Sequence, residues 1–291
     1  MNTPAWKAFL ISVPVVSVLI WLVKFNPAGN FWGTIETPKA QCEAYDVDQL
    51  RTLTSLSPAI YDQKKLDRLI REPQNTFSNL PYLTIGLAVF LAARRWLTQA
   101  WGLGCMFLGI GSGLYHASLL PEWRLIDILG VYVALFGLIA IGVDSGLKAR
   151  ATPRREFATA GLIWIAAFWA GIHRNDIRIA GFKLFDSTYV VVIGVALGSI
   201  LALGAYLRTS HKRRYFLALG ALTLAAPLAF AGGLGDRFGG FLANPDAMIQ
   251  GHSIWHALGA IALLAAYEVF ASTGYDRSVF IRDDVPDSDV F

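Results

Sequence analysis

Gly251-His-Ser-Ile-Trp-His256 opens an apolar stretch that continues to Ser272 and is rich in Ala and Leu. About 20 apolar residues are enough to cross the hydrocarbon core of a bilayer as one helix. The two histidines are four residues apart, so on a helix their side chains lie on the same face. A metal-binding or ionisable side chain at membrane depth is costly to place there and therefore indicates a function. The stretch predicts a membrane helix that begins in a functional site.

The composition extends this interpretation to the whole chain. Of the 291 residues, 55% are hydrophobic and 16% are charged, and the mean hydropathy is +0.47. This exceeds the apolar share of soluble domains, and the excess lies in long blocks. Eight segments are apolar and long enough to cross a membrane, at residues 6–23, 76–93, 99–119, 124–143, 156–172, 185–207, 214–232 and 251–272. We therefore expect an all-α fold, a polytopic membrane helical bundle.

Cysteine and charge usage exclude other classes of protein. Cys42 lies in polar sequence and Cys105 in an apolar run, so neither a disulfide framework nor a thiolate zinc site is indicated. The net charge of +4 comes from Lys and Arg clustered between the apolar segments. It therefore reflects membrane topology, and we expect no nucleic-acid partner.

Basic residues gather in alternate connections, around residues 94–95, 148–155 and 208–214. Such clusters are typical of cytoplasmic loops, and eight spans then place both termini in the cytoplasm. The predicted segments are 1–24, an extra N-terminal transmembrane helix; 25–75, an outer-side loop with interfacial helices; 76–272, a seven-helix catalytic core; and 273–291, an acidic cytoplasmic tail. A secretory signal is an alternative interpretation of the first segment.

Three residues near the ends of predicted spans are expected at the membrane surface. Trp101 has the character of an interfacial anchor, and Asp144 and Glu268 are expected to reach lipid headgroups.

The polar residues inside the apolar segments converge once the helices alternate in direction. Ser112 and His116 lie near the end of the third segment, Asp127 begins the fourth, and His252 and His256 begin the eighth. All of them fall on the outer side and at similar depth. The second segment begins on the same side with Asn75, Ser78 and Asn79.

Three imidazoles at a common depth suit zinc. Three neutral histidines and one open position form a hydrolytic site, in which the metal activates water and polarises a carbonyl. Asp127 is then a candidate general base, or an acceptor that holds one imidazole in place. Ser112 is a candidate hydrogen-bond donor to the oxyanion of the reaction.

These residues resemble the motifs of alkaline ceramidases, which belong to a superfamily of seven-helix metal hydrolases that includes the adiponectin receptors. The resemblance covers residues 42–272 and rests on Glu72-Pro-Gln-Asn75-Thr-Phe-Ser78-Asn79, Gly111-Ser112-Gly-Leu-Tyr115-His116, Asp127 and His252-Ser-Ile-Trp255-His256. It implies zinc held by His116, His252 and His256, with Ser112 and Asp127 as the catalytic serine and aspartate. The implied reaction is hydrolysis of the N-acyl amide of ceramide, taken from the bilayer, to a fatty acid and a long-chain base. The first span would be an additional helix ahead of the family's core.

The resemblance also bears on calcium and on supporting residues. Alkaline ceramidases can carry a calcium site, and Glu43 and Glu72 match two of its ligands here, whereas Ala40 and Gln41 depart from the Asp and Trp of that pattern. Glu72 could equally complement a helix dipole. The residues expected to support the metal ligands or to contact the substrate are Asn75, Ser78, Asn79, Tyr115 and Trp255. For Asn75, Ser78 and Asn79, helix capping or support of the ligands is weighed equally against direct contact with the substrate.

Two other functions stay open at this point. The first is a non-catalytic lipid receptor or sensor with a structural zinc, as in the receptor relatives of the superfamily. The second is haem binding, since histidines that face each other between membrane helices can ligate iron.

Overall fold

The structure is a computed structural model that describes residues 70–147, 152–174, 176, 178–179, 182–183, 187–209, 212–237, 249–276 and 278–279. The expectations for residues 1–69 lie outside the described residues. They concern the extra N-terminal helix, the interfacial helices of the outer loop, and Glu43. Most of the acidic tail lies outside as well.

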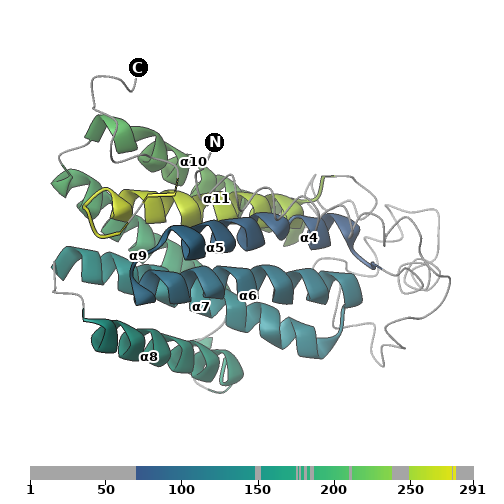
Figure 1. The fold of residues 1–291 in the computed structure, drawn as a ribbon. Coiled ribbons are helices and arrows are strands. Elements are labelled where there is room, and N and C mark those ends of the chain that lie inside the picture. Colours follow the sequence, from purple (N-terminus) through teal and green to yellow (C-terminus); the bar gives the residue numbers. More distant parts are fainter. Residues whose placement is uncertain are drawn as a thin grey trace, which may run out of the picture.

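The regular structure of the described residues is helical apart from one small hairpin. The helices are α4 (Pro73–Phe77), α5 (Leu80–Ala92), α6 (Trp96–Ser118), α7 (Pro121–Leu147), α8 (Pro153–Ile172), α9 (Ser187–Arg208), α10 (Lys212–Arg237) and α11 (Gly251–Ala271). The hairpin joins two-residue strands, β1 (Arg178–Ile179) and β2 (Phe182–Lys183), which pair antiparallel. Figure 1 shows the long helices lying side by side in one bundle. The prediction of an all-α membrane bundle is confirmed.

Helix boundaries follow local sequence signals. The second predicted segment is divided into α4 and α5 at Ser78 and Asn79, and each of the two helices has a proline in its first turn, where the missing N–H costs nothing. Helix α8 also begins with proline, and the Thr152 side chain caps it by accepting from the backbone N–H of Arg155 at 3.4 Å. Helix α6 ends where Leu119 adopts a positive φ of 55°. This turn sends the chain back as α7.

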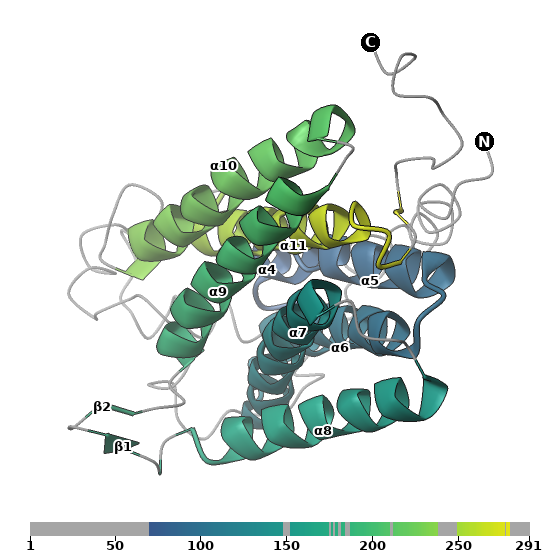
Figure 2. The same cartoon turned by 90° about the vertical axis from the view of Figure 1, so that its left-hand side faces the viewer.

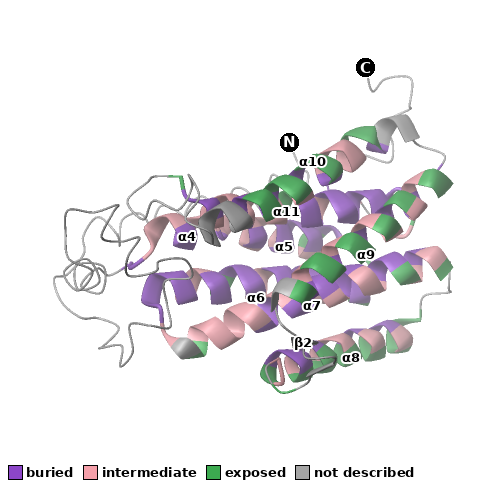
Figure 3. Ribbon diagram, turned by 180° about the vertical axis from the view of Figure 1, so that it is seen from behind, coloured by how far each residue is buried: buried purple, intermediate pink, exposed green. Residues whose placement is uncertain are grey.

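Four of the described helices are long and apolar enough to cross a membrane. These are residues Glu122–Leu147, Tyr189–Arg208, Tyr215–Gly232 and Gly251–Ala271. Large apolar side chains such as Phe157, Ile165 and Leu224 are two-thirds exposed on the outside of α8 and α10, and Figure 3 shows such exposed positions along the outer faces of α8, α9 and α10. Apolar surface of this extent is stable in lipid rather than in water. The chain is therefore a membrane protein.

Close contact between α5 and α6 fixes the position of α4. A Cβ atom at Gly86 would lie 2.5 Å from the carbonyl oxygen of Gly102, and one at Gly109 would lie 2.8 Å from the backbone nitrogen of Leu83. Small residues at such crossings let helix backbones approach directly, as in other membrane bundles. As a result, α4 lies beside the C-terminal end of α6 and the beginning of α11 (Figure 1).

Asp144 belongs to a charge network at the end of the bundle where α7 ends and α8 begins. Its carboxylate lies 2.7 Å from the guanidinium of Arg95, bonds to Arg155, and accepts from the Tyr275 hydroxyl at 3.1 Å. Arg95 also lies 2.6 Å from Glu156. Burial opposes the charge of Arg95, but Tyr275, Glu156 and Asp144 together raise its pKa above the usual value. The network joins α6, α7, α8 and the segment after α11.

The expectations that Glu268 and Trp101 lie at the membrane surface were wrong. Glu268 is only 4% exposed, and its carboxylate accepts from the backbone N–H of Val279 and from the Ser278 hydroxyl. Trp101 is 1% exposed, stacks on Tyr267 with ring centroids 5.4 Å apart, and donates to the Ala134 carbonyl at 2.8 Å. Tertiary packing satisfies the polar groups of both side chains inside the protein.

Candidate metal centre

The three predicted metal ligands lie together at one end of the bundle. Their potential ligand nitrogens all fall within 4.8 Å of one another. Nε2 of His116 is 3.1 Å from Nε2 of His252, and the ring centroids of His252 and His256 are 4.4 Å apart. His116 and His256 are buried, and His252 is partly buried. The structure therefore brings together, from α6 and α11, the histidines that the sequence pattern singled out.

Helix α11 begins with reciprocal hydrogen bonds between Gln250 and Ser253, in the turn that carries His252. The Ser253 hydroxyl accepts from the backbone N–H of Gln250 at 3.2 Å, and the Gln250 side chain accepts from the backbone of the first helical turn. Such a capping box satisfies backbone donors that the helix itself leaves unpaired. It fixes the start of the helix two residues before His252.

The segment at α4 contacts the other ring nitrogens of His116 and His256. Nδ1 of His116 lies 2.7 Å from a carboxylate oxygen of Glu72. Nδ1 of His256 lies 2.9 Å from the Ser78 hydroxyl and 3.3 Å from the Asn75 carbonyl oxygen. A carboxylate and a carbonyl only accept hydrogen bonds, so Nδ1 carries the hydrogen in both rings. The Nε2 lone pairs of His116 and His256 are thereby left for a metal.

The cluster fits a tetrahedral metal ion. Zn–N bonds of about 2.0–2.1 Å in tetrahedral geometry separate the ligand nitrogens by roughly 3.3 Å, close to the 3.1 Å between His116 and His252. Three histidine ligands leave the fourth position for water or substrate. The same spacing leaves no room for a haem macrocycle, which must lie between its two axial nitrogens.

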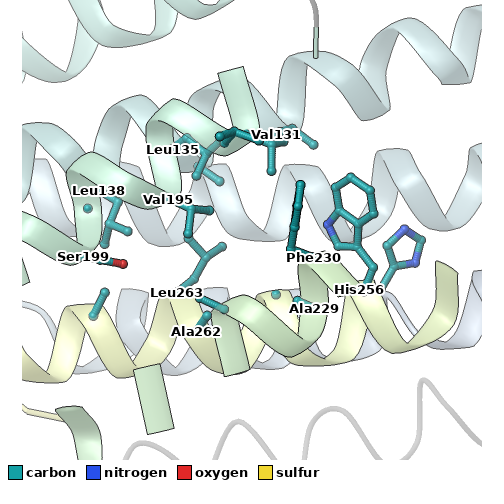
Figure 4. A pocket seen from close by; sticks show the side chains of 18 of the residues that line it. Val131, Leu135, Leu138, Val195, Ser199, Ala229, Phe230, His256, Ala262 and Leu263 are labelled. Carbon is teal, nitrogen blue, oxygen red and sulfur yellow. The ribbon is translucent and has the colours of Figure 1, made fainter. Parts of the chain in front are cut away.

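A cavity of about 690 Å³ adjoins the histidines. Ser112, Asp127, His252 and His256 line it at one end. Figure 4 shows His256 at that end and a run of aliphatic side chains leading away from it to Ser199. The Ser112 hydroxyl is buried and, within the described part of the chain, makes no hydrogen bond. A buried hydroxyl that has no hydrogen-bond partner and lies beside a cavity can donate a hydrogen bond to a molecule bound there.

The remaining predicted residues surround the same centre. Asn79 lines the cavity, while its side chain donates to the Asn75 carbonyl at 2.8 Å. The Tyr115 ring lies 5.0 Å from that of His116. Trp255 lines the cavity 6.0 Å from the ring of His252. Asn79, the residue before α5, makes no side-chain capping hydrogen bond.

Two residues of the site were missed in the sequence. Tyr82 lines the cavity and lies edge-on to His256, with ring centroids 6.4 Å apart. Arg124 lines the cavity near Asp127. Both lie about one helical turn from a predicted site residue, Tyr82 after Ser78 and Arg124 before Asp127, so helical spacing was the available signal.

Comparison with known proteins identifies the family. A search of curated proteins found no match. The family model described as Ceramidase matches residues 65–278, which include all three histidines of the cluster. Because this match covers most of the chain, the protein belongs to the ceramidase family.

Proposed function

We propose that the protein is a zinc-dependent intramembrane amidase that hydrolyses the N-acyl amide of ceramide-like lipids to a fatty acid and a long-chain base. Family membership supports ceramide hydrolysis in general. The observation that carries the zinc proposal is the convergence of His116, His252 and His256 on one point at the wall of an apolar cavity.

The three histidines would hold zinc through the nitrogens that face one another. When bound, zinc supplies Lewis acidity, which lowers the pKa of a water ligand and polarises the amide carbonyl. The protein contributes a rigid and largely buried ligand set, so no reorganisation of the site is needed during the reaction.

Ser112 is suited to stabilise the negative charge that forms on the carbonyl oxygen, and Asp127 is suited to transfer the proton of the attacking water. Water adds to the carbonyl carbon, the carbon–nitrogen bond breaks, and the nitrogen leaves as the amine of the long-chain base. Asp127, on the cavity wall, would take a proton from the attacking water and return it to the leaving amine. The Ser112 hydroxyl would donate to the oxygen that becomes negative.

The shape of the cavity favours a long apolar substrate that arrives from the side. The cavity follows α11 from His256 to Ala266, which corresponds to about 15 Å at the rise of an α-helix. Its walls include Val192 and Ile200 of α9, which are 42% and 65% exposed on the lipid-facing surface. Figure 2 shows α9 and α10 together on the flank opposite α8. We propose that the lipid passes between α9 and α10 and lays one chain along α11.

We also place the metal centre toward the outer side of the membrane. It lies at the end of the bundle opposite Arg94, Arg95 and Arg155, and basic residues of this kind mark cytoplasmic loops.

Product analysis tests the proposal directly. The purified protein with zinc is expected to release equal amounts of fatty acid and long-chain base from ceramide in detergent or lipid vesicles. Stripping the metal with a chelator should abolish the release, and zinc should restore it. Full hydrolysis by the metal-free protein, or no hydrolysis of any N-acyl lipid by the zinc-loaded protein, would contradict the proposal.

Narrowing the cavity should discriminate against long acyl chains. Val195 lines the cavity in its aliphatic part (Figure 4), and Val195→Phe would fill space that a long chain needs. Overpacking costs about 1–3 kcal/mol, so kcat/KM for long-chain ceramides should fall about 10- to 100-fold, with a smaller loss for short-chain ones. Gly204→Phe on the same helix is the control, since an added Cβ there meets nothing within 4 Å. Equal losses for both chain lengths would argue against a chain in this cavity.

A further inference from the structure

The backbone itself brings Glu72 to His116. The N–H of Glu72 donates to the His116 carbonyl, and the N–H of Arg71 donates to the Ala117 carbonyl, each at 3.0 Å. The Arg71 guanidinium, 1% exposed, also bonds to the Ser118 carbonyl. These bonds fix the segment before α4 against the end of α6 without any contribution from the Glu72 carboxylate. The position of that carboxylate is therefore set by the fold.

The Glu72 carboxylate is partnered by N–H donors. One of its oxygens accepts from Nδ1 of His116 at 2.7 Å and from the side-chain amide of Asn75 at 3.3 Å. The side chains of His116 and Glu72 are only 3% and 13% exposed. A carboxylate in such a place is stabilised by charge-assisted hydrogen bonds.

The same short segment also holds a second metal ligand. The Ser78 hydroxyl donates to the Asn75 carbonyl at 2.8 Å, so its lone pair is directed to Nδ1 of His256 at 2.9 Å. One turn of chain thus fixes the tautomer of two imidazoles that come from α6 and α11.

We propose that Glu72 is a positioning residue for the metal centre. Its carboxylate holds His116 as the Nδ1–H tautomer, with Nε2 directed at the metal, and its negative charge makes the imidazole a stronger ligand. This proposal rests on the metal role of the histidines proposed above. It assigns to Glu72 a function that differs from the one expected from the sequence.

Zinc affinity tests the proposal without any hydrolysis assay. Glu72→Gln keeps the size of the side chain and removes its charge, and loss of such an outer partner lowers metal affinity about 10- to 100-fold. Thr76→Val is the matched control: it removes the 2.8 Å bond from the Thr76 hydroxyl to the Glu72 carbonyl and keeps the Glu72 carboxylate. Competition of the full-length protein with a zinc chelator should show weakened binding in Glu72→Gln alone. Unchanged affinity in Glu72→Gln, or an equal loss in Thr76→Val, would overturn the proposal.

A second measurement uses the metal-free protein. The chain has five histidines, so ¹⁵N-histidine labelling yields a spectrum that single substitutions can assign. His116 should be in the Nδ1–H form in the parent and in a mixture of tautomers in Glu72→Gln. The same mixture in the parent would contradict the proposal. So would calcium binding that Glu72→Gln abolishes while zinc affinity stays at the parent value.

The two proposals can fail separately. A protein whose zinc affinity depends on Glu72 but that cleaves no N-acyl lipid would refute the amidase and leave the role of Glu72 intact. An active zinc amidase whose zinc affinity and His116 tautomer are the same in Glu72→Gln as in the parent would refute the role of Glu72 and leave the amidase proposal intact.

Discussion

His252→Ala is expected to remove zinc binding and ceramide hydrolysis together. The substitution deletes one of three converging ligands and leaves His116 and His256 as a two-coordinate remnant. Stabilisation of a transition state by a metal amounts to several kcal/mol, so turnover should fall by about 10³-fold or more. Metal analysis of the purified variant and product analysis with ceramide check the two losses in the same sample.

The matched control is another histidine replaced in the same way. His173 follows α8, pairs with Asp176 at 3.0 Å, is 42% exposed, and belongs neither to the cluster nor to the cavity wall. His173→Ala should therefore retain zinc content and turnover. A His252→Ala protein that has lost its zinc yet hydrolyses ceramide at the parent rate would refute zinc catalysis.

The sequence was sufficient to predict that His116, His252 and His256 lie together, because helix direction alone brings them to one end of the bundle. Ser112 and His116 end one helix, Asp127 lies near the start of the next, and His252 and His256 begin the last. Alternation of helices across a membrane puts these ends at one level, and the four-residue spacing puts the paired residues on one face. No side-chain packing needs to be known for that step.

Tertiary packing determines the features that could not be predicted from the sequence. Trp101, Asp144 and Glu268 sit near span ends and were expected at the surface, yet each finds partners from distant segments inside the protein. The role of Glu72 depends on two backbone bonds that pair residues 71–72 with residues 116–117. The length of the cavity depends on how far α9 and α10 stand from α7 and α11. None of these distances is encoded in local periodicity.

Asp127→Asn is expected to separate catalysis from zinc binding, and so to distinguish an amidase from a lipid receptor that keeps a structural zinc. The amide has nearly the shape of the carboxylate but cannot take a proton from water. A lost general base costs about 10²- to 10⁴-fold in rate. Asp127 is not one of the three clustered nitrogen ligands, so zinc content should match that of the parent. Ceramide turnover and zinc content are both measured on the same preparation. The first should fall and the second should stay at the parent value.

The control for Asp127→Asn is the same change of carboxylate to amide at Asp176, which is exposed beside His173 and outside the cavity. Asp176→Asn should leave both zinc and turnover unchanged. If Asp127→Asn instead loses zinc along with activity, the carboxylate serves the metal ligands and not the proton transfer. If the parent binds ceramide and zinc but releases no product, there is no turnover for Asp127 to support, and the cavity is that of a receptor. A catalytic role for Asp127 requires the third pattern, in which zinc is retained and the rate is lost, because a general base acts on the reacting water and does not hold the metal.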